Sequence, residues 1–128
     1  MPVRMWGIPS PMYFGASFHK PHGLVCSYTF PVTMETIAPA VPEKVKYVGK
    51  ILGATFSGNE SEAESGAKTA TAYRSFRDVL YNGKRVAFPI TGEKLPRFAE
   101  AVVNEAFAPL PPVKVDVVLT TKMLRKIC

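Results

Sequence analysis

The clearest hydrophobic pattern lies in the middle of the chain, over residues 60–81. Apolar side chains recur there at spacings of three or four residues: Ala63, Ala67, Ala70, Tyr73, Phe76 and Leu80. This spacing places them on one face of an α-helix. Ser57 or Asn59 could cap the start of the helix, and Asn82-Gly83 could end it with a left-handed residue. The pattern therefore predicts one long helix over residues 60–81.

The end of this segment also fits a β-hairpin. Residues 79–86 read as two short strands on either side of Asn82-Gly83, a dipeptide that favours a type I′ turn. The two structures exclude each other. We prefer the helix because its periodic signal is longer.

Two further segments follow this helix. Thr91 is a possible N-cap, and a second apolar stripe predicts a helix that ends before Pro109; the stripe consists of Leu95, Phe98, Val102 and Ala106. The last segment, residues 113–127, has apolar positions that suit either a helix or a strand. Periodicity slightly favours a strand over residues 113–119.

The first half of the chain has a different character. Residues 1–60 hold seven of the twelve prolines and six of the nine glycines, and in residues 1–42 these alternate with aromatic side chains. Proline fixes φ and removes a backbone donor, so long helices are not expected there. We therefore expect an extended N-terminal arm over residues 1–56, in which residues 43–56 form a short helix or a strand. The arm could lie in the groove of a partner or cover this protein's own core.

Charge and cysteine content narrow the possible partners. The formal net charge is +6, and residues 65–98 hold seven basic side chains against two acidic ones. This excess favours an acidic partner, namely nucleic acid, anionic lipid or an acidic protein, although it also suits a solvated surface. The two cysteines, Cys26 and Cys128, lie far apart and do not indicate a disulfide framework. No apolar stretch approaches the ~20 residues that span a bilayer.

The sequence shows no assembled catalytic or metal site. His19, His22 and Cys26 have a metal-like spacing, but a fourth nearby ligand is missing. The only aspartates, Asp78 and Asp116, have no histidine partner in sequence that would suggest a triad. Neither Gly-Lys dipeptide has the spacing of a phosphate-binding loop. We therefore expect no catalysis, no metal and no cofactor in this chain.

A family resemblance enters at residues 72–77, which read Ala-Tyr-Arg-Ser-Phe-Arg within the predicted helix. This resembles the signature of LYR-motif proteins, which carry Leu-Tyr-Arg near the start of a helix in a small three-helix fold. Residues 104–107, 115–119 and 122–124 resemble later helices of one branch, the LYR-type accessory subunit of the matrix arm of respiratory complex I. The resemblance covers about residues 60–127. Ala72 replaces the leucine, and the link between the second and third helices is shorter than in that branch.

The resemblance implies a function that depends on protein partners. LYR proteins bind the mitochondrial acyl carrier protein, an acidic partner that carries an acyl-phosphopantetheine group. The implied partner-binding residues are Tyr73, Arg74, Arg77, Lys84 and Arg85. The implied lining of an acyl-chain pocket is Ala72, Phe76, Leu80, Phe98 and Val102.

The sequence thus predicts a mostly α-helical protein, with an extended arm over residues 1–56 and an LYR-like three-helix domain over residues 57–128. Its predicted role is that of a non-catalytic accessory subunit on the matrix side of the inner mitochondrial membrane. An RNA-binding organellar ribosomal protein is the alternative, because the chain is basic and the aromatic arm could run through RNA. Residues 1–42 carry only Arg4 and Lys20 as basic side chains, which are few for an arm that follows phosphates.

Overall fold

The computed structural model describes residues 16–104, 113 and 116–127. After a helical turn at residues 16–18, five α-helices follow one another: α2 (His22–Ile37), α3 (Pro42–Ile51), α4 (Glu62–Leu80), α5 (Leu95–Val103) and α6 (Val117–Arg125). These residues contain no β-strand. The mostly α-helical fold class is therefore confirmed for the described part of the chain.

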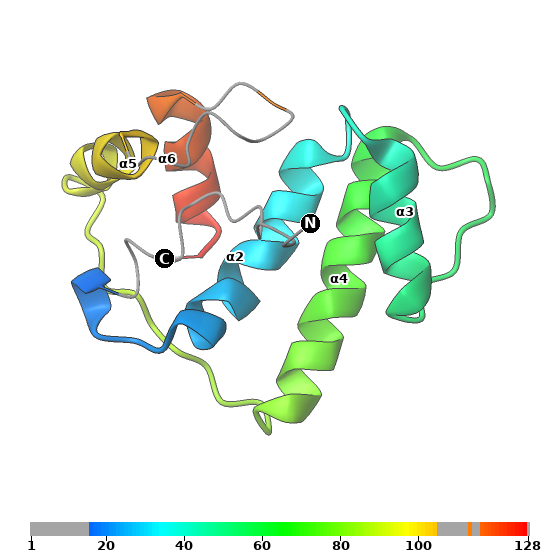
Figure 1. The fold of residues 1–128 in the computed structure, drawn as a ribbon, viewed down its shortest axis with the longest axis horizontal. Coiled ribbons are helices and arrows are strands. Elements are labelled where there is room, and N and C mark those ends of the chain that lie inside the picture. The colour runs from blue at the N-terminus through cyan, green and yellow to red at the C-terminus, as the bar shows by residue number, and fades with distance from the viewer. Residues whose placement is uncertain (1–15, 105–112, 114–115, 128) are drawn as a thin grey trace, which may run out of the picture.

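The helices pack as two groups (Figure 1). In the first group α4 lies between α2 and α3, and in the second α5 packs against α6. Helix α2 joins the groups, because its buried side chains belong to each of three core clusters. Val25 packs with Phe88, Leu95, Ala99 and Leu124, Met34 and Ile37 pack with Val45, and Val32 packs with Met123. The predicted three-helix domain over residues 57–128 is not confirmed, because each core cluster includes residues of α2, which precedes that range.

The prediction of an extended arm fails over residues 22–51, where α2 and α3 form. Pro42 stands at the first position of α3, where a missing N–H costs no hydrogen bond. Pro31 lies inside α2 and cannot donate to the carbonyl of Ser27, four residues earlier. That carbonyl instead accepts a hydrogen bond from Nη1 of Arg77 at 3.3 Å. A side chain from α4 therefore compensates for the proline, a contact that local sequence rules do not anticipate.

Helix α4 confirms the preferred interpretation of residues 60–81. Its N-cap is Ser61, two or more residues later than expected, and a capping box pairs Ser61 with Glu64. Asn82 and Gly83 have φ values of 51° and 70°, and the Gly83 N–H donates to the Asp78 carbonyl at 2.9 Å. This left-handed closure ends the helix. The alternative hairpin over residues 79–86 is therefore wrong.

The buried face of α4 is not the predicted apolar stripe. Its buried residues are Ser65, Gly66, Thr69, Ala70 and Arg77, whereas most members of the predicted stripe are exposed. The reason is close approach of the helices. A Cβ on Gly66 would lie 2.9 Å from the Cβ of Ala38 and 3.1 Å from the Cα of Glu35, and a Cβ on Gly49 would clash with Oγ1 of Thr69. Small side chains are required where α4 meets α2 and α3.

The remaining helices settle the open alternatives. Residues 43–56 begin with a helix, α3, and the apolar stripe after Thr91 forms α5, in which Leu95, Ala99 and Val102 are buried. Asp116 caps α6 by accepting a hydrogen bond from the Leu119 N–H at 2.7 Å. The preference for a strand is therefore wrong over residues 117–119. Residues 114–115 of the predicted strand and Ala106 of the preceding predicted helix lie outside the described residues. None of the described helices has the length and apolarity needed to cross a membrane.

Candidate functional site

The residues predicted to bind a partner divide into an inward group and an outward group. Arg77 is 8% exposed, and its guanidinium lies 4.3 Å from the centroid of the Tyr28 ring in a cation–π contact. It also donates to the carbonyl of Ser27 and to the carboxylate of Asp78. A guanidinium with these contacts is part of the internal packing between α2 and α4.

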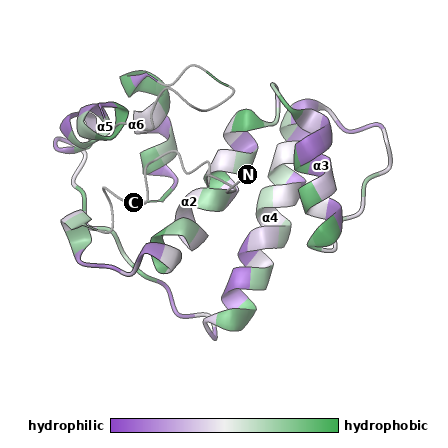
Figure 2. Cartoon of the chain, in the orientation of Figure 1, coloured by the Kyte–Doolittle hydropathy of each residue, from purple (hydrophilic) through white to green (hydrophobic). Residues whose placement is uncertain are grey.

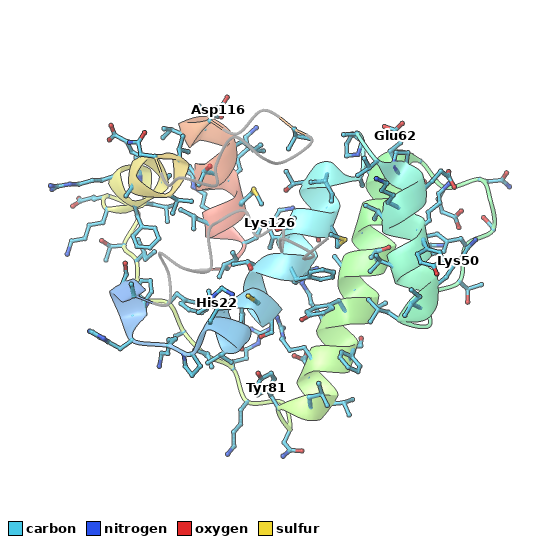
Figure 3. All side chains as sticks on the ribbon, viewed as in Figure 1. His22, Lys50, Glu62, Tyr81, Asp116 and Lys126 are labelled. Carbon is cyan, nitrogen blue, oxygen red and sulfur yellow. The ribbon has the colours of Figure 1, made fainter. Side chains whose placement is uncertain are left out.

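Tyr73 and Arg74 also face α2. The Tyr73 ring packs on Phe30 with the centroids 4.6 Å apart, and burial raises the pKa of its phenol. Arg74 forms an ion pair with Glu35 at 3.0 Å. Lys126, the C-cap residue of α6 (labelled in Figure 3), forms a second ion pair with the same carboxylate at 2.5 Å. Glu35 therefore connects α2 to both α4 and α6. Tyr73, Arg74 and Arg77 are used to hold the helices together.

Lys84 and Arg85 form the outward group. Both are exposed on the segment that follows α4, and neither forms an ion pair with another described residue. The five residues thus do not make one contact surface. Their role in binding a partner stays a prediction.

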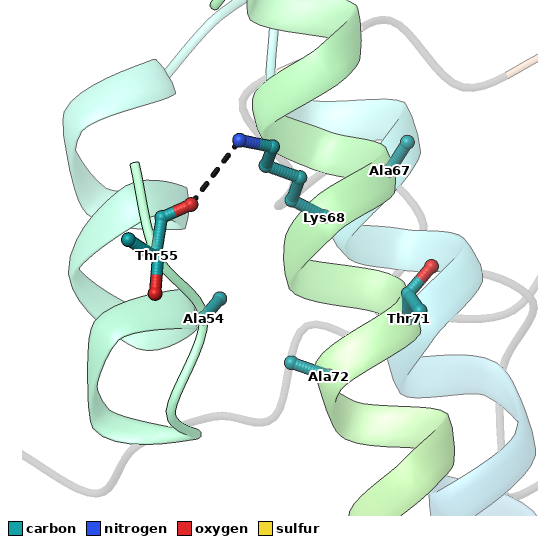
Figure 4. Close-up of a pocket in the computed structure, with 6 residues that line it drawn as sticks. All are labelled: Ala54, Thr55, Ala67, Lys68, Thr71 and Ala72. Atoms are coloured by element: carbon teal, nitrogen blue, oxygen red, sulfur yellow. Dashed lines mark hydrogen bonds between the residues drawn. The ribbon is translucent and has the colours of Figure 1, made fainter. Parts of the chain in front are cut away.

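The residues predicted to line an acyl-chain pocket are not brought together in the described structure. Phe76 and Leu80 are exposed, Val102 is buried in the core, and Phe98 packs on Phe18 with the ring centroids 5.8 Å apart. Ala72 lines a different, shallow cavity of about 410 Å³ together with Ala54, Thr55, Ala67, Lys68 and Thr71 (Figure 4).

The ammonium of Lys68 at this cavity already has partners within the chain. Lys68 donates to the Thr55 carbonyl at 3.1 Å and pairs with Glu60 at 2.6 Å. The ammonium of Lys68, followed by the backbone N–H of Ser57, holds the pKa of the Glu60 carboxyl well below its ordinary value of 4.5. These contacts fix the loop between α3 and α4, and the cavity has no unpaired charge among its lining residues.

The two histidines lie at the beginning of α2. His22 is the first residue of the helix (Figure 3), and His19 precedes it with a left-handed φ of 51°. Both imidazoles are exposed, whereas Cys26 is buried and burial raises the pKa of its thiol. Among the described residues, no three metal-binding side chains gather in one place. The spacing of His19, His22 and Cys26 in the sequence therefore does not correspond to a metal site formed by those three residues.

Comparison with known proteins indicates a different family from the LYR-motif proteins. Residues 12–128 match the family model described as the Fe-containing alcohol dehydrogenase family, C-terminal. Neither the curated proteins nor the solved structures include a significant match.

The family match corrects several predictions at once. The LYR resemblance is wrong. The predicted complex I accessory role and the ribosomal alternative are also wrong, and so are the predicted absence of catalysis and the predicted absence of a cofactor. The three-residue signature was misleading, because Tyr73 and Arg74 lie on α4 and pack against α2. The acyl carrier protein partner and the mitochondrial location depended on that resemblance, and nothing tests them here.

The match begins before α2 and continues through α6, so it includes every helix described above. It also includes both histidines. The chain belongs to the Fe-containing alcohol dehydrogenase family, whose C-terminal region it matches.

Proposed function

We propose that this chain forms the helical C-terminal part of an iron-dependent oxidoreductase that oxidises alcohols with NAD(P) as the electron acceptor. The single observation that carries the proposal is the family match over residues 12–128. The all-helical structure of the described residues is compatible with a domain that supports a site rather than with one that binds a dinucleotide on a parallel sheet.

The described residues do not by themselves fit an iron ion. Iron in such enzymes needs several ligands with nitrogen or oxygen donors, as in sites with two histidines and a carboxylate. His19 and His22 supply two exposed imidazoles, but no third ligand gathers beside them in the described residues, and the Cys26 thiol is buried. The described residues would therefore contribute at most these two imidazoles to an iron site, and the other ligands would come from outside the described residues.

Their position on the fold supports this contribution. His22 is held at the end of α2, which is anchored by Val25 in the core cluster with Phe88 and Leu124. Phe18 packs on Phe88 with the centroids 5.6 Å apart, which fixes the turn that carries His19. The two exposed imidazoles are thus carried by segments that pack on the core.

The test uses the tagged chain purified from the cells that produce it. We expect the purified material, including any associated polypeptide that supplies the dinucleotide site and the remaining iron ligands, to contain iron and to reduce NAD⁺ or NADP⁺ when a primary alcohol is added. The variant His22→Ala should lower the iron content, while Lys50→Ala, at an exposed position on α3, should leave it unchanged. Material that contains the chain but neither iron nor alcohol-dependent activity would contradict the proposal.

A further inference from the structure

The end of α4 exposes an unusual set of apolar side chains. Phe76 is 50% exposed, Val79 77%, Leu80 63% and Tyr81 38%. The first three share one face of the helix because they are spaced by three and four residues. Isolated exposed apolar side chains are common, but a contiguous group at one place marks a surface that contacts something other than water.

Basic side chains stand directly beside this group. Lys84 and Arg85 follow the Asn82-Gly83 closure, and both are exposed without an ion-pair partner among the described residues. By contrast, Lys68, Arg74 and Arg77 on the same helix are paired with acidic residues of this chain. The positive charge that remains available near α4 is therefore concentrated at its C-terminal end.

We call Phe76, Val79, Leu80, Tyr81, Lys84 and Arg85 the α4 tip. Figure 1 shows that this end of α4 extends beyond α3 to the edge of the molecule, and Figure 3 places Tyr81 at that edge. In Figure 2 the end of the helix is coloured as hydrophobic. The shallow cavity beside Ala72 lies farther back along α4 and includes none of the residues of the α4 tip.

An apolar helix end that projects from a protein is better suited to insertion into a lipid surface than to a rigid groove on another protein. Aliphatic side chains can enter the boundary between lipid headgroups and acyl chains, and a tyrosine is favoured at that depth. Lysine and arginine beside them are attracted to anionic headgroups. The net charge of +6 acts in the same direction. We propose that the α4 tip binds the surface of an anionic lipid bilayer as a peripheral contact, a property that does not depend on the dehydrogenase activity.

The experiment is sedimentation of the full chain with lipid vesicles of two compositions. We expect binding to vesicles of equal parts phosphatidylcholine and phosphatidylserine, and little binding to phosphatidylcholine alone. Each basic side chain near an anionic surface strengthens binding roughly fivefold, so the double variant Lys84→Glu, Arg85→Glu should weaken it by about 25-fold or more. The double variant Val79→Ser, Leu80→Ser should weaken it roughly tenfold or more.

A matched control lies on α3, where Lys50 and Ile51 also form an exposed pair of a basic and an apolar side chain. Lys50→Glu, Ile51→Ser should bind lipid nearly as the unmodified chain does. Circular dichroism of each variant verifies that the helices remain. Failure of the unmodified chain to bind anionic vesicles overturns the proposal and favours an acidic protein as the partner. Equal losses in the α3 control and the α4 tip variants would also overturn it, because charge alone would then explain binding.

Discussion

The contact between Arg77 and the carbonyl of Ser27 leads to a quantitative prediction. Arg77→Leu removes a charged donor from a buried carbonyl that Pro31 leaves without its helical hydrogen bond. Such a loss costs about 1.5–3 kcal/mol. The cation–π contact with Tyr28 adds roughly 0.5–2 kcal/mol. We expect Arg77→Leu to lower the free energy of unfolding by about 2–4 kcal/mol, since the two contributions overlap.

The role of Pro31 can be isolated by a double-mutant cycle. Pro31→Ala supplies the N–H that the Ser27 carbonyl lacks, so the same arginine substitution should cost about 1–2 kcal/mol less in that background. Unfolding in urea, followed by circular dichroism, measures all four free energies. Arg85→Leu, at an exposed position, is the control and should change stability by less than about 0.5 kcal/mol. A coupling energy near zero between positions 31 and 77 would refute this explanation of the buried arginine.

Three further predictions concern α4 and the loop before it. Gly66→Ala should destabilise the fold by about 1–2 kcal/mol in thermal or urea unfolding, because overpacking against α2 exceeds the gain in helix propensity. The control is Gly23→Ala, which should stabilise the fold or be neutral, because nothing lies within 4 Å of the added Cβ. Ser61→Ala should cost about 0.5–2 kcal/mol by removing the capping box, measured in the same way. The pKa of Glu60 is lowered in the folded state, so its contribution to stability is fully present above pH 4.5 and is lost as the pH falls further. Glu60→Gln should therefore flatten the dependence of the melting temperature on pH on the acid side, and an unchanged slope would show that the pairing with Lys68 does not matter.

Much of the helical structure was predictable because local signals are strong there. The glutamates near the start of α4, its periodic alanines and the Asn82-Gly83 closure together locate the helix to within two residues at each end. The stripe of α5 is a local signal too, whereas the pattern of residues 113–119 favours a strand and does not predict α6. The sequence does not predict α2, because proline is ordinarily a helix breaker and Pro31 lies inside this helix.

The candidate site was predicted less well, for two physical reasons. A motif of three residues cannot distinguish side chains that bind a partner from side chains that bind the neighbouring helix, and Arg74 and Arg77 do the latter. The spacing of His19 and His22 is visible in the sequence, but ligands that come together from distant parts of a chain leave no local pattern. The apolar stripe predicts burial at the end of α4, where the side chains are exposed, because periodicity identifies one face of a helix but not what covers that face.

The sequence by itself determined where α4 and α5 form, since capping, periodicity and turn residues act within a few positions of one another. It also determined the charge of the chain. Only the tertiary structure decided which face of α4 is buried, because that depends on how closely α2 approaches Gly66. It likewise decided that α2 continues through Pro31, because the donor that satisfies the Ser27 carbonyl comes from Arg77, fifty residues away.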